Sequence, residues 1–312
     1  MKKLLSIDGG GIRGVIPALI LAEIEERTNQ STASLFDLMA GTSTGGIISL
    51  ALSRDGGGGV SKYRALDLVD LYVDRGPDIF SRSFWQGVSS VAGIADEKYS
   101  QEPLEAILRE YFDDTPLDAA LTRVLVSGYA IETRSPFFFK SWRDKSRGVL
   151  MREAARATSA APTYFEPALV QVQGQEVALI DGGVYVNNPA MSAYSEARRL
   201  FPDETDFLLV SLGTGSLTRP IRYQEAKDWG KVQWALPILS VVFDGVSGAV
   251  DYQLGQILGE SFFRFQTNLE TANDDMDDAS PANLAALKLE ARHIIATQGA
   301  EIDRVCQLLT QP

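Results

Sequence analysis

The chain is poor in the two side chains that most often bind metals or activate a serine. Its 312 residues contain one histidine, His293, and one cysteine, Cys306. One cysteine forms no intramolecular disulfide, and a reducing, cytoplasmic location fits this composition. With so few nitrogen and sulfur ligands, we expect no metal site and no cofactor. A hydrolytic serine in this chain would have to use His293 as its base, or no histidine at all.

Positive charge is scarce as well. Lys and Arg total 29 against 41 Asp and Glu, which gives a formal net charge of −12 and a pI of about 4.7. Proteins bind nucleic-acid phosphates through clustered Lys and Arg, so we expect no nucleic-acid partner. The same charge argues against permanent electrostatic binding to anionic lipid, but it leaves transient contact with a membrane surface open.

Long apolar runs are also missing. A signal peptide needs about 7–15 apolar residues, and residues 1–7 supply too few, so we interpret them as the start of a first strand. The apolar stretch 234–243 is too short to cross a bilayer. These features predict a cytoplasmic protein that is peripheral to the membrane when it acts.

Strand-like and helix-like segments alternate along the chain, which predicts an α/β fold with a mainly parallel central sheet and helices on both faces. Hydrophobic residues make up 45% of the chain, enough for a packed core. We expect a catalytic core over residues 1–215 and a mostly helical part over 216–312 that packs on the same domain. The predicted strands are 3–7, 35–40, 123–133, 137–142, 176–180, 206–212 and 262–266. The main predicted helices are 15–27, 44–52, 64–74, 102–112, 152–159 and 189–200.

Residues 41–45 read GTSTG and follow a short apolar strand. The pattern G-x-S-x-G marks a strained strand-to-helix turn that exposes a nucleophilic serine, here Ser43. Gly41 and Gly45 leave room for the turn and for a substrate, and the N-terminus of the following helix favours developing negative charge. The alternative is that Ser43 only caps the helix.

Residues 9–14 read GGGIRG, and they follow the first predicted strand and precede a helix. Glycines at a helix start present free backbone N–H groups, which bind a pyrophosphate or an oxyanion equally well. A dinucleotide site would need an acidic residue after the second strand, where this chain has Ser43 instead. We therefore favour an oxyanion hole formed by Gly10 and Gly11. Arg13 either adds positive charge there or braces the loop through a salt bridge.

Asp181 ends another apolar strand and is followed by Gly182 and Gly183. Active sites of α/β proteins form at the C-terminal ends of sheet strands, although D-G is also an ordinary turn. His293, the rival base, lies within a predicted amphipathic helix, whereas a catalytic histidine usually lies on a loop. Beside a reactive serine, Asp181 is therefore the better candidate.

Together these motifs resemble the patatin-like phospholipase family. The resemblance rests on DGGGIRG at 8–14, GTSTG at 41–45 and DGG at 181–183, with supporting matches at 155–165, 187–189 and 212–215. It implies a three-layer α/β sandwich and a phospholipase A or related lipid acyl hydrolase that works through a Ser–Asp dyad without calcium. It implies Ser43 as nucleophile, Asp181 as general base, and Gly10 and Gly11 as oxyanion donors. The residues that would complete the motifs are Gly9, Arg13, Gly14, Gly41, Gly45, Gly182 and Gly183.

Substrate specificity and regulation are less determined by the sequence. Phe80, Phe84 and Trp85, within an irregular segment 76–101, form either a lid for the lipid or part of the core, and so does the stretch 234–243. The acidic run 274–278 is interpreted as a solvated loop rather than a calcium site. A nucleotide-binding module and a catalytically silent scaffold are the alternatives to an enzyme. A small-molecule activator acting through residues 216–312 and the oligomeric state stay open.

Overall fold

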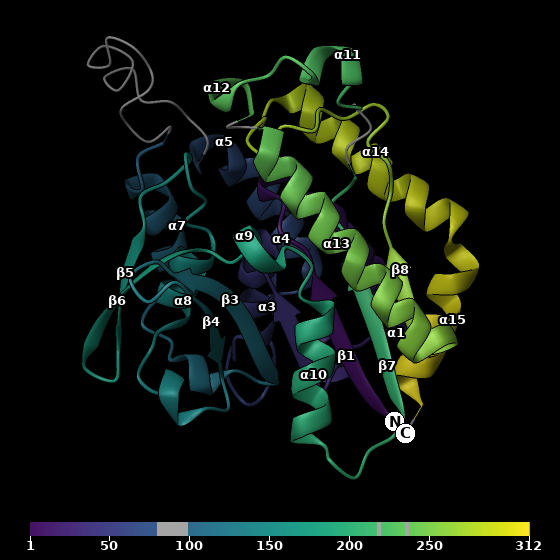
Figure 1. The fold of residues 1–312 in the computed structure, drawn as a ribbon. Helices are drawn as coiled ribbons and strands as arrows, with labels where there is room; N and C mark the ends of the chain where they lie inside the picture. Colours follow the sequence, from purple (N-terminus) through teal and green to yellow (C-terminus); the bar gives the residue numbers. More distant parts are fainter. Residues whose placement is uncertain (80–98, 217–219, 235–236, 312) are drawn as a thin grey trace.

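The computed structural model describes residues 1–79, 99–216, 220–234 and 237–311. The described residues form an eight-stranded sheet through the centre of the molecule, with helices on both faces (Figure 1). The strands are β1 (Lys2–Ile7), β2 (Leu38–Gly41), β3 (Arg123–Ala130), β4 (Ser135–Lys140), β5 (Ala168–Val172), β6 (Gln175–Asp181), β7 (Phe207–Leu212) and β8 (Phe262–Phe265).

The helices follow the predicted positions closely up to residue 200. Pro17 lies in the first turn of the first long helix, and Asn29 ends that helix with a left-handed φ of 53°. The α-helices are α1 (Val15–Thr28), α2 (Thr32–Leu35), α3 (Thr44–Ser53), α4 (Ala65–Asp70), α5 (Gly76–Ile79), α7 (Glu102–Phe112), α8 (Met151–Thr158), α9 (Gly183–Val186), α10 (Ala190–Leu200), α11 (Tyr223–Ala226), α12 (Lys231–Trp234), α13 (Pro237–Leu258), α14 (Pro281–Thr297) and α15 (Gly299–Thr310).

Five strands form the parallel centre of the sheet, in the order β3-β2-β1-β7-β8. β4 and β6 pair antiparallel with β3, and β5 pairs antiparallel with β6. All residues of β7 are buried, as expected for a parallel strand that is covered on both faces. The predicted mainly parallel sheet is confirmed, with an antiparallel edge added to it.

Neighbouring residues of the central strands belong to two different cores because successive side chains of a strand point to opposite faces. Leu5 and Met39 lie in the larger core, which includes residues of α1, α3, α8, α14 and α15. Leu4 and Leu38 lie in the smaller core, which α10 and α13 cover. Figure 1 shows α10 and α13 across one face of the sheet. The two cores and the sheet between them make the expected three-layer sandwich.

One strand, β5, does not appear among the predicted strands. Its residues are alternately buried and exposed, with Leu169 64% exposed, as is usual at a sheet edge. A tight turn joins it to β6, and both turn residues, Gln173 and Gly174, have positive φ. Gln-Gly is a weaker hairpin signal than Asn-Gly or Asp-Gly, which explains why the hairpin was missed.

The C-terminal part of the chain joins the same sheet. β8 pairs with β7, and α14 packs on α1. The boundary at residue 215 stays a prediction. Phe80, Phe84 and Trp85 lie outside the described residues, as do residues 235 and 236 of the second apolar stretch. None of the described helices, including the 22-residue α13, combines the length and apolar character needed to cross a bilayer.

Candidate active site

Ser43 lies in the sharp turn between β2 and α3. Its φ of 53° and ψ of −123° are a conformation that residues with side chains rarely adopt, and such strain is typical of a nucleophile elbow. The turn is closed by a hydrogen bond of 2.8 Å from the Gly45 N–H to the Thr42 carbonyl. A Cβ atom on Gly41 would collide with the backbone of Gly45, so only glycine fits there.

Strand pairing brings this elbow to Asp181. β2 pairs with β3 at residues 123–126 and β6 pairs with β3 at residues 128–130, both on the edge opposite β4. β2 runs parallel to β3 and β6 runs antiparallel to it, so the C-terminal ends of β2 and β6 meet along one edge. Ser43 follows the end of β2, and Asp181, paired with Gly128, is the last residue of β6.

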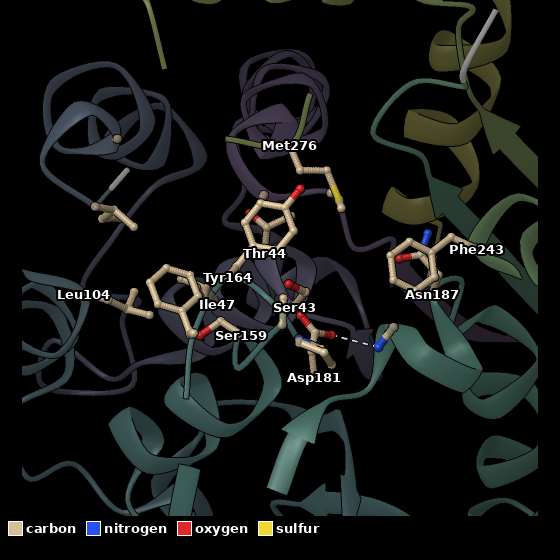
Figure 2. A pocket seen from close by; sticks show the side chains of 18 of the residues that line it. Ser43, Thr44, Ile47, Leu104, Ser159, Tyr164, Asp181, Asn187, Phe243 and Met276 are labelled. Carbon is tan, nitrogen blue, oxygen red and sulfur yellow. Dashed lines mark hydrogen bonds between the residues drawn. The ribbon is translucent and has the colours of Figure 1, made fainter. Parts of the chain in front are cut away.

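Asp181 is 5% exposed, and its carboxyl accepts a hydrogen bond of 2.7 Å from the Gly183 N–H (Figure 2). The Ser43 side chain lies next to this carboxyl in the same pocket (Figure 2). Burial raises the pKa of Asp181 to about 6, against the lowering effect of the neighbouring Ser43 side chain and of the Gly183 N–H. Such a carboxyl is a stronger base than an exposed aspartate and is still ionised at neutral pH.

The glycine-rich loop is held by its neighbours but leaves two amides free. The Gly9 N–H donates to the Asn187 carbonyl at 3.0 Å, and the Ile12 N–H donates to the Met276 carbonyl at 2.9 Å. Between them, the N–H groups of Gly10 and Gly11 have no acceptor among the described residues. Both glycines line the pocket that contains Ser43. These free amides are therefore available to an oxyanion formed at Ser43.

Arg13 lies behind this loop and supports it. Its side chain is 7% exposed, and its Nε and Nη1 donate to the carbonyls of Gly10 and Gly215 at 3.3 and 3.4 Å. It forms no ion pair with a described carboxylate, and it does not line the pocket at Ser43. These contacts favour the bracing role over a direct charge at the oxyanion, with backbone carbonyls as the partners.

The carboxyl of Asp8, just before the loop, is held by Arg264 of β8. The Arg264 Nη2 lies 2.6 Å from Asp8 Oδ2, and its Nε lies 3.1 Å from Asp251. Burial raises the pKa of Asp8 to about 6, against the lowering effect of Arg264. The first residue of the glycine motif thus depends on a cation from the C-terminal part of the chain.

An apolar pocket of about 90 Å³ lies beside Ser43. Three of its wall residues, Tyr72, Ile79 and Leu104, come from the segment between α3 and β3. The two ends of that segment are joined, because the Leu121 N–H donates to the Ser53 carbonyl at 2.8 Å. The other apolar walls, several of which Figure 2 labels, are Ile47, Tyr164, Phe165, Phe243 and Met276.

His293 lies elsewhere. Its side chain is exposed on α14, and it is absent from the lining of the apolar pocket. Among the described residues, no group of three or more His, Cys, Asp or Glu side chains is arranged to hold a metal ion.

Comparison with known proteins agrees with this geometry. The sequence model of the family described as "Patatin-like phospholipase" matches residues 5–194. The chain belongs to the patatin-like phospholipase family. Its curated relatives include "Patatin-like protein 2" of Oryza sativa subsp. indica, 31% identical over 91% of this chain and 81% of the relative. "Patatin group M-3" of Solanum tuberosum is 33% identical over 92% of this chain and 82% of the relative. Family membership supports a lipid acyl hydrolase at the level of the family.

The patatin-like motifs gather five predicted residues in one pocket, namely Gly10, Gly11, Ser43, Asp181 and Gly183. The remaining motif glycines pack behind them: a Cβ atom on Gly14 would meet Thr44, and one on Gly182 would meet Ser127. The motif glycines therefore have two roles. Some allow close packing, and Gly10 and Gly11 supply the free N–H groups.

Several residues of this patatin-like site were not predicted. Met276 lies in the acidic run expected to be a solvated loop, yet it lines the pocket, and its carbonyl holds the Ile12 N–H. That expectation was wrong for Met276, and the signal was an apolar residue between two pairs of aspartates. Leu104 and Thr158 were also missed as site residues, because helical periodicity marks both as ordinary core positions.

Proposed function

We propose that this protein is a serine-dependent carboxylic-ester hydrolase, a phospholipase A that releases fatty acids from membrane glycerolipids. The observation that carries the proposal is that the Ser43 side chain lies beside the buried Asp181 carboxyl, whose pKa is raised to about 6. Family membership supports a lipid substrate, and the apolar pocket beside Ser43 supports an acyl chain as the bound group.

In the first step, Asp181 accepts the Ser43 proton while the Ser43 Oγ attacks the ester carbonyl carbon. The oxyanion that forms accepts hydrogen bonds from the N–H groups of Gly10 and Gly11. When this intermediate collapses, the C–O bond to the alcohol breaks. The alcohol, a lysolipid, leaves with the proton from Asp181, and the acyl group stays on Ser43.

In the second step, Asp181 accepts a proton from water as the water oxygen attacks the acyl carbonyl. The same two amides bind the second oxyanion. Its collapse breaks the bond to Ser43, which regains the proton from Asp181, and a fatty acid leaves. One oxyanion donor is typically worth about 3–4 kcal/mol, so two preformed donors compensate for a base weaker than histidine.

Intact mass after treatment with a fluorophosphonate tests this proposal. We expect one adduct on the wild type and on His293→Ala, and none on Ser43→Ala. Loss of labelling in folded His293→Ala would show that the serine depends on His293, and the proposed dyad would then give way to a triad. No adduct on folded wild type would favour the silent scaffold, and saturable nucleotide binding without esterase activity would favour the nucleotide module. The geometry supports that module less, because the free amides face the pocket of Ser43.

We also propose that the protein acts in the cytoplasm and contacts the membrane surface only transiently. The net charge of −12 opposes lasting binding to anionic lipid. Sedimentation with anionic vesicles should leave most of the protein in the supernatant. Stable binding at physiological salt would contradict this part of the proposal.

A further inference from the structure

A second cavity, of about 350 Å³, adjoins the apolar pocket. The two share four lining residues, which are Tyr164, Asn187, Phe243 and Met276. Figure 2 shows Asn187 and Phe243 on one side of Ser43, and Ile47 and Leu104 on the other side. The lining of the second cavity is mostly polar, with Ser216, Ser240 and Ser247 among its hydroxyl groups. Ser43 lines the apolar pocket, and the polar cavity begins at the four shared residues.

A glycerolipid ester has the same two-sided character. Its acyl chain is apolar, and its alcohol side carries the polar headgroup. With the ester carbonyl at Ser43 and the acyl chain in the apolar pocket, the alcohol side extends toward the polar cavity. The order of the two spaces thus assigns the leaving group to the cavity of about 350 Å³.

Most charged groups that face this cavity are already engaged. Asp8 and Asp251 share Arg264, and Arg13 donates to backbone carbonyls. Asp274 and Asp275 make interactions of their own.

Asp244, on α13, differs from these groups. It has no hydrogen bond or ion pair with any described residue. Burial raises the pKa of Asp244, and the nearby Arg13 cation lowers it. The cavity therefore presents one carboxylate, close to the Arg13 cation, whose hydrogen-bonding capacity is not used within the described chain.

We propose that this cavity binds the lipid headgroup, and that Asp244 selects headgroups ending in an ammonium group over anionic ones. The inference rests on the proposed function, since it needs Ser43 to cleave the ester. An ammonium group offers three hydrogen-bond donors and a positive charge to the Asp244 carboxylate. An anionic headgroup would meet like charge at the same place.

Competition within one mixed micelle tests the proposal. Phosphatidylethanolamine and phosphatidylglycerol with the same acyl chains are presented in equal amounts, and the two lysolipids are counted by mass. Both substrates share one surface, so weak binding of the acidic protein to that surface cancels from the ratio. The partly exposed Asp244 should favour the ethanolamine lipid by about five-fold. Asp244→Asn should bring the ratio near one, and Asp244→Lys should reverse it.

Asp203→Lys is the matched control, because it makes the same charge change on an exposed loop outside both cavities and should keep the wild-type ratio. Hydrolysis of p-nitrophenyl butyrate, which has no headgroup, should be equal in the wild type and in Asp203→Lys. A wild-type lipid ratio in folded Asp244→Lys would overturn the headgroup assignment alone. Retained p-nitrophenyl activity in folded Ser43→Ala would instead overturn the proposed function, so the two failures are distinguishable.

Discussion

The backbone N–H of Ser43 donates a hydrogen bond of 2.8 Å to the hydroxyl of Thr158, which is fully buried at the end of α8. The elbow is thus tied to a helix of the larger core, and the tie acts on the residue whose backbone is strained. Thr158 touches no substrate in the proposed mechanism. Its role is to position Ser43.

Replacing Thr158 by valine keeps the shape of the side chain and removes the hydroxyl that accepts the hydrogen bond from the Ser43 N–H. The Ser43 N–H would then be buried without a partner, which costs about 1–3 kcal/mol in the free energy of unfolding. Displacement of the elbow should lower kcat by roughly 10- to 100-fold, because a small misalignment of the nucleophile strongly slows the reaction. Urea unfolding and ester hydrolysis measure both effects. Thr158→Ser, which retains the hydroxyl, should recover most of kcat, and a folded valine variant with normal kcat would refute the positioning role.

The pH dependence of catalysis should follow Asp181. The carboxyl must be ionised to accept the Ser43 proton, and its pKa is about 6. We therefore expect kcat/KM to fall about ten-fold per pH unit below pH 6 and to level off above it. Circular dichroism over the same range controls for unfolding, since the pKa of buried Asp8 is also raised to about 6. A profile that is flat from pH 5 to pH 8 would exclude Asp181 as the base.

Asp181→Asn should separate stability from activity. The pKa of Asp181 is higher in the folded chain, about 6, than its ordinary value of 3.8, so the native state binds the proton more tightly. Ionisation therefore destabilises the fold as pH rises through this window, by about 3 kcal/mol when complete. Asparagine keeps an oxygen for the Gly183 N–H without the charge. The variant should be more stable than the wild type at pH 8 but not at pH 3.5, while turnover falls by orders of magnitude. Equal stability gains at both pH values would contradict this account.

Ser43→Gly and Ser43→Ala should differ in stability, although both variants should be inactive. The φ of 53° and ψ of −123° suit glycine and strain alanine. We expect the glycine variant to exceed the alanine variant by about 1 kcal/mol in the free energy of unfolding. Thermal unfolding of the two proteins side by side gives the comparison. A more stable alanine variant would mean that the elbow relaxes in the absence of the serine.

Arg264→Ala should destabilise the fold, because it leaves Asp8 buried without its cation. Breaking a buried ion pair on one side costs about 3–5 kcal/mol. The loss should be larger at pH 8 than at pH 5, since protonation relieves the unpaired carboxylate. Adding Asp8→Asn to Arg264→Ala should restore part of the lost stability. Full stability of the single variant at pH 8 would show that water replaces the arginine.

The sequence located the site residues through short local patterns. The elbow and the glycine loop depend on backbone conformations within a few residues, and Ser43 with its positive φ is such a case. Most strands and helices follow from apolar periodicity, and the parallel centre of the sheet follows from their alternation. These features were predictable because each one needs only neighbouring residues.

Long-range contacts were not predictable in this way. No local pattern shows that β6 pairs with β3 beside the end of β2, or that Met276 supports the loop at Ile12. Arg264 and Asp8 lie 256 residues apart in the chain. The type of each residue is visible in the sequence, but which residues come into contact depends on the order of the strands in the sheet.

The joined ends of the segment between Ser53 and Leu121 make that part of the chain a natural cassette. It supplies Tyr72, Ile79 and Leu104 to the apolar pocket beside Ser43 and contributes neither Ser43 nor Asp181. Since its two ends already meet, a homologous segment can be grafted there with little change to the sheet. The lining of the apolar pocket can therefore diversify in evolution, or be exchanged by design, while Ser43 and Asp181 are inherited unchanged.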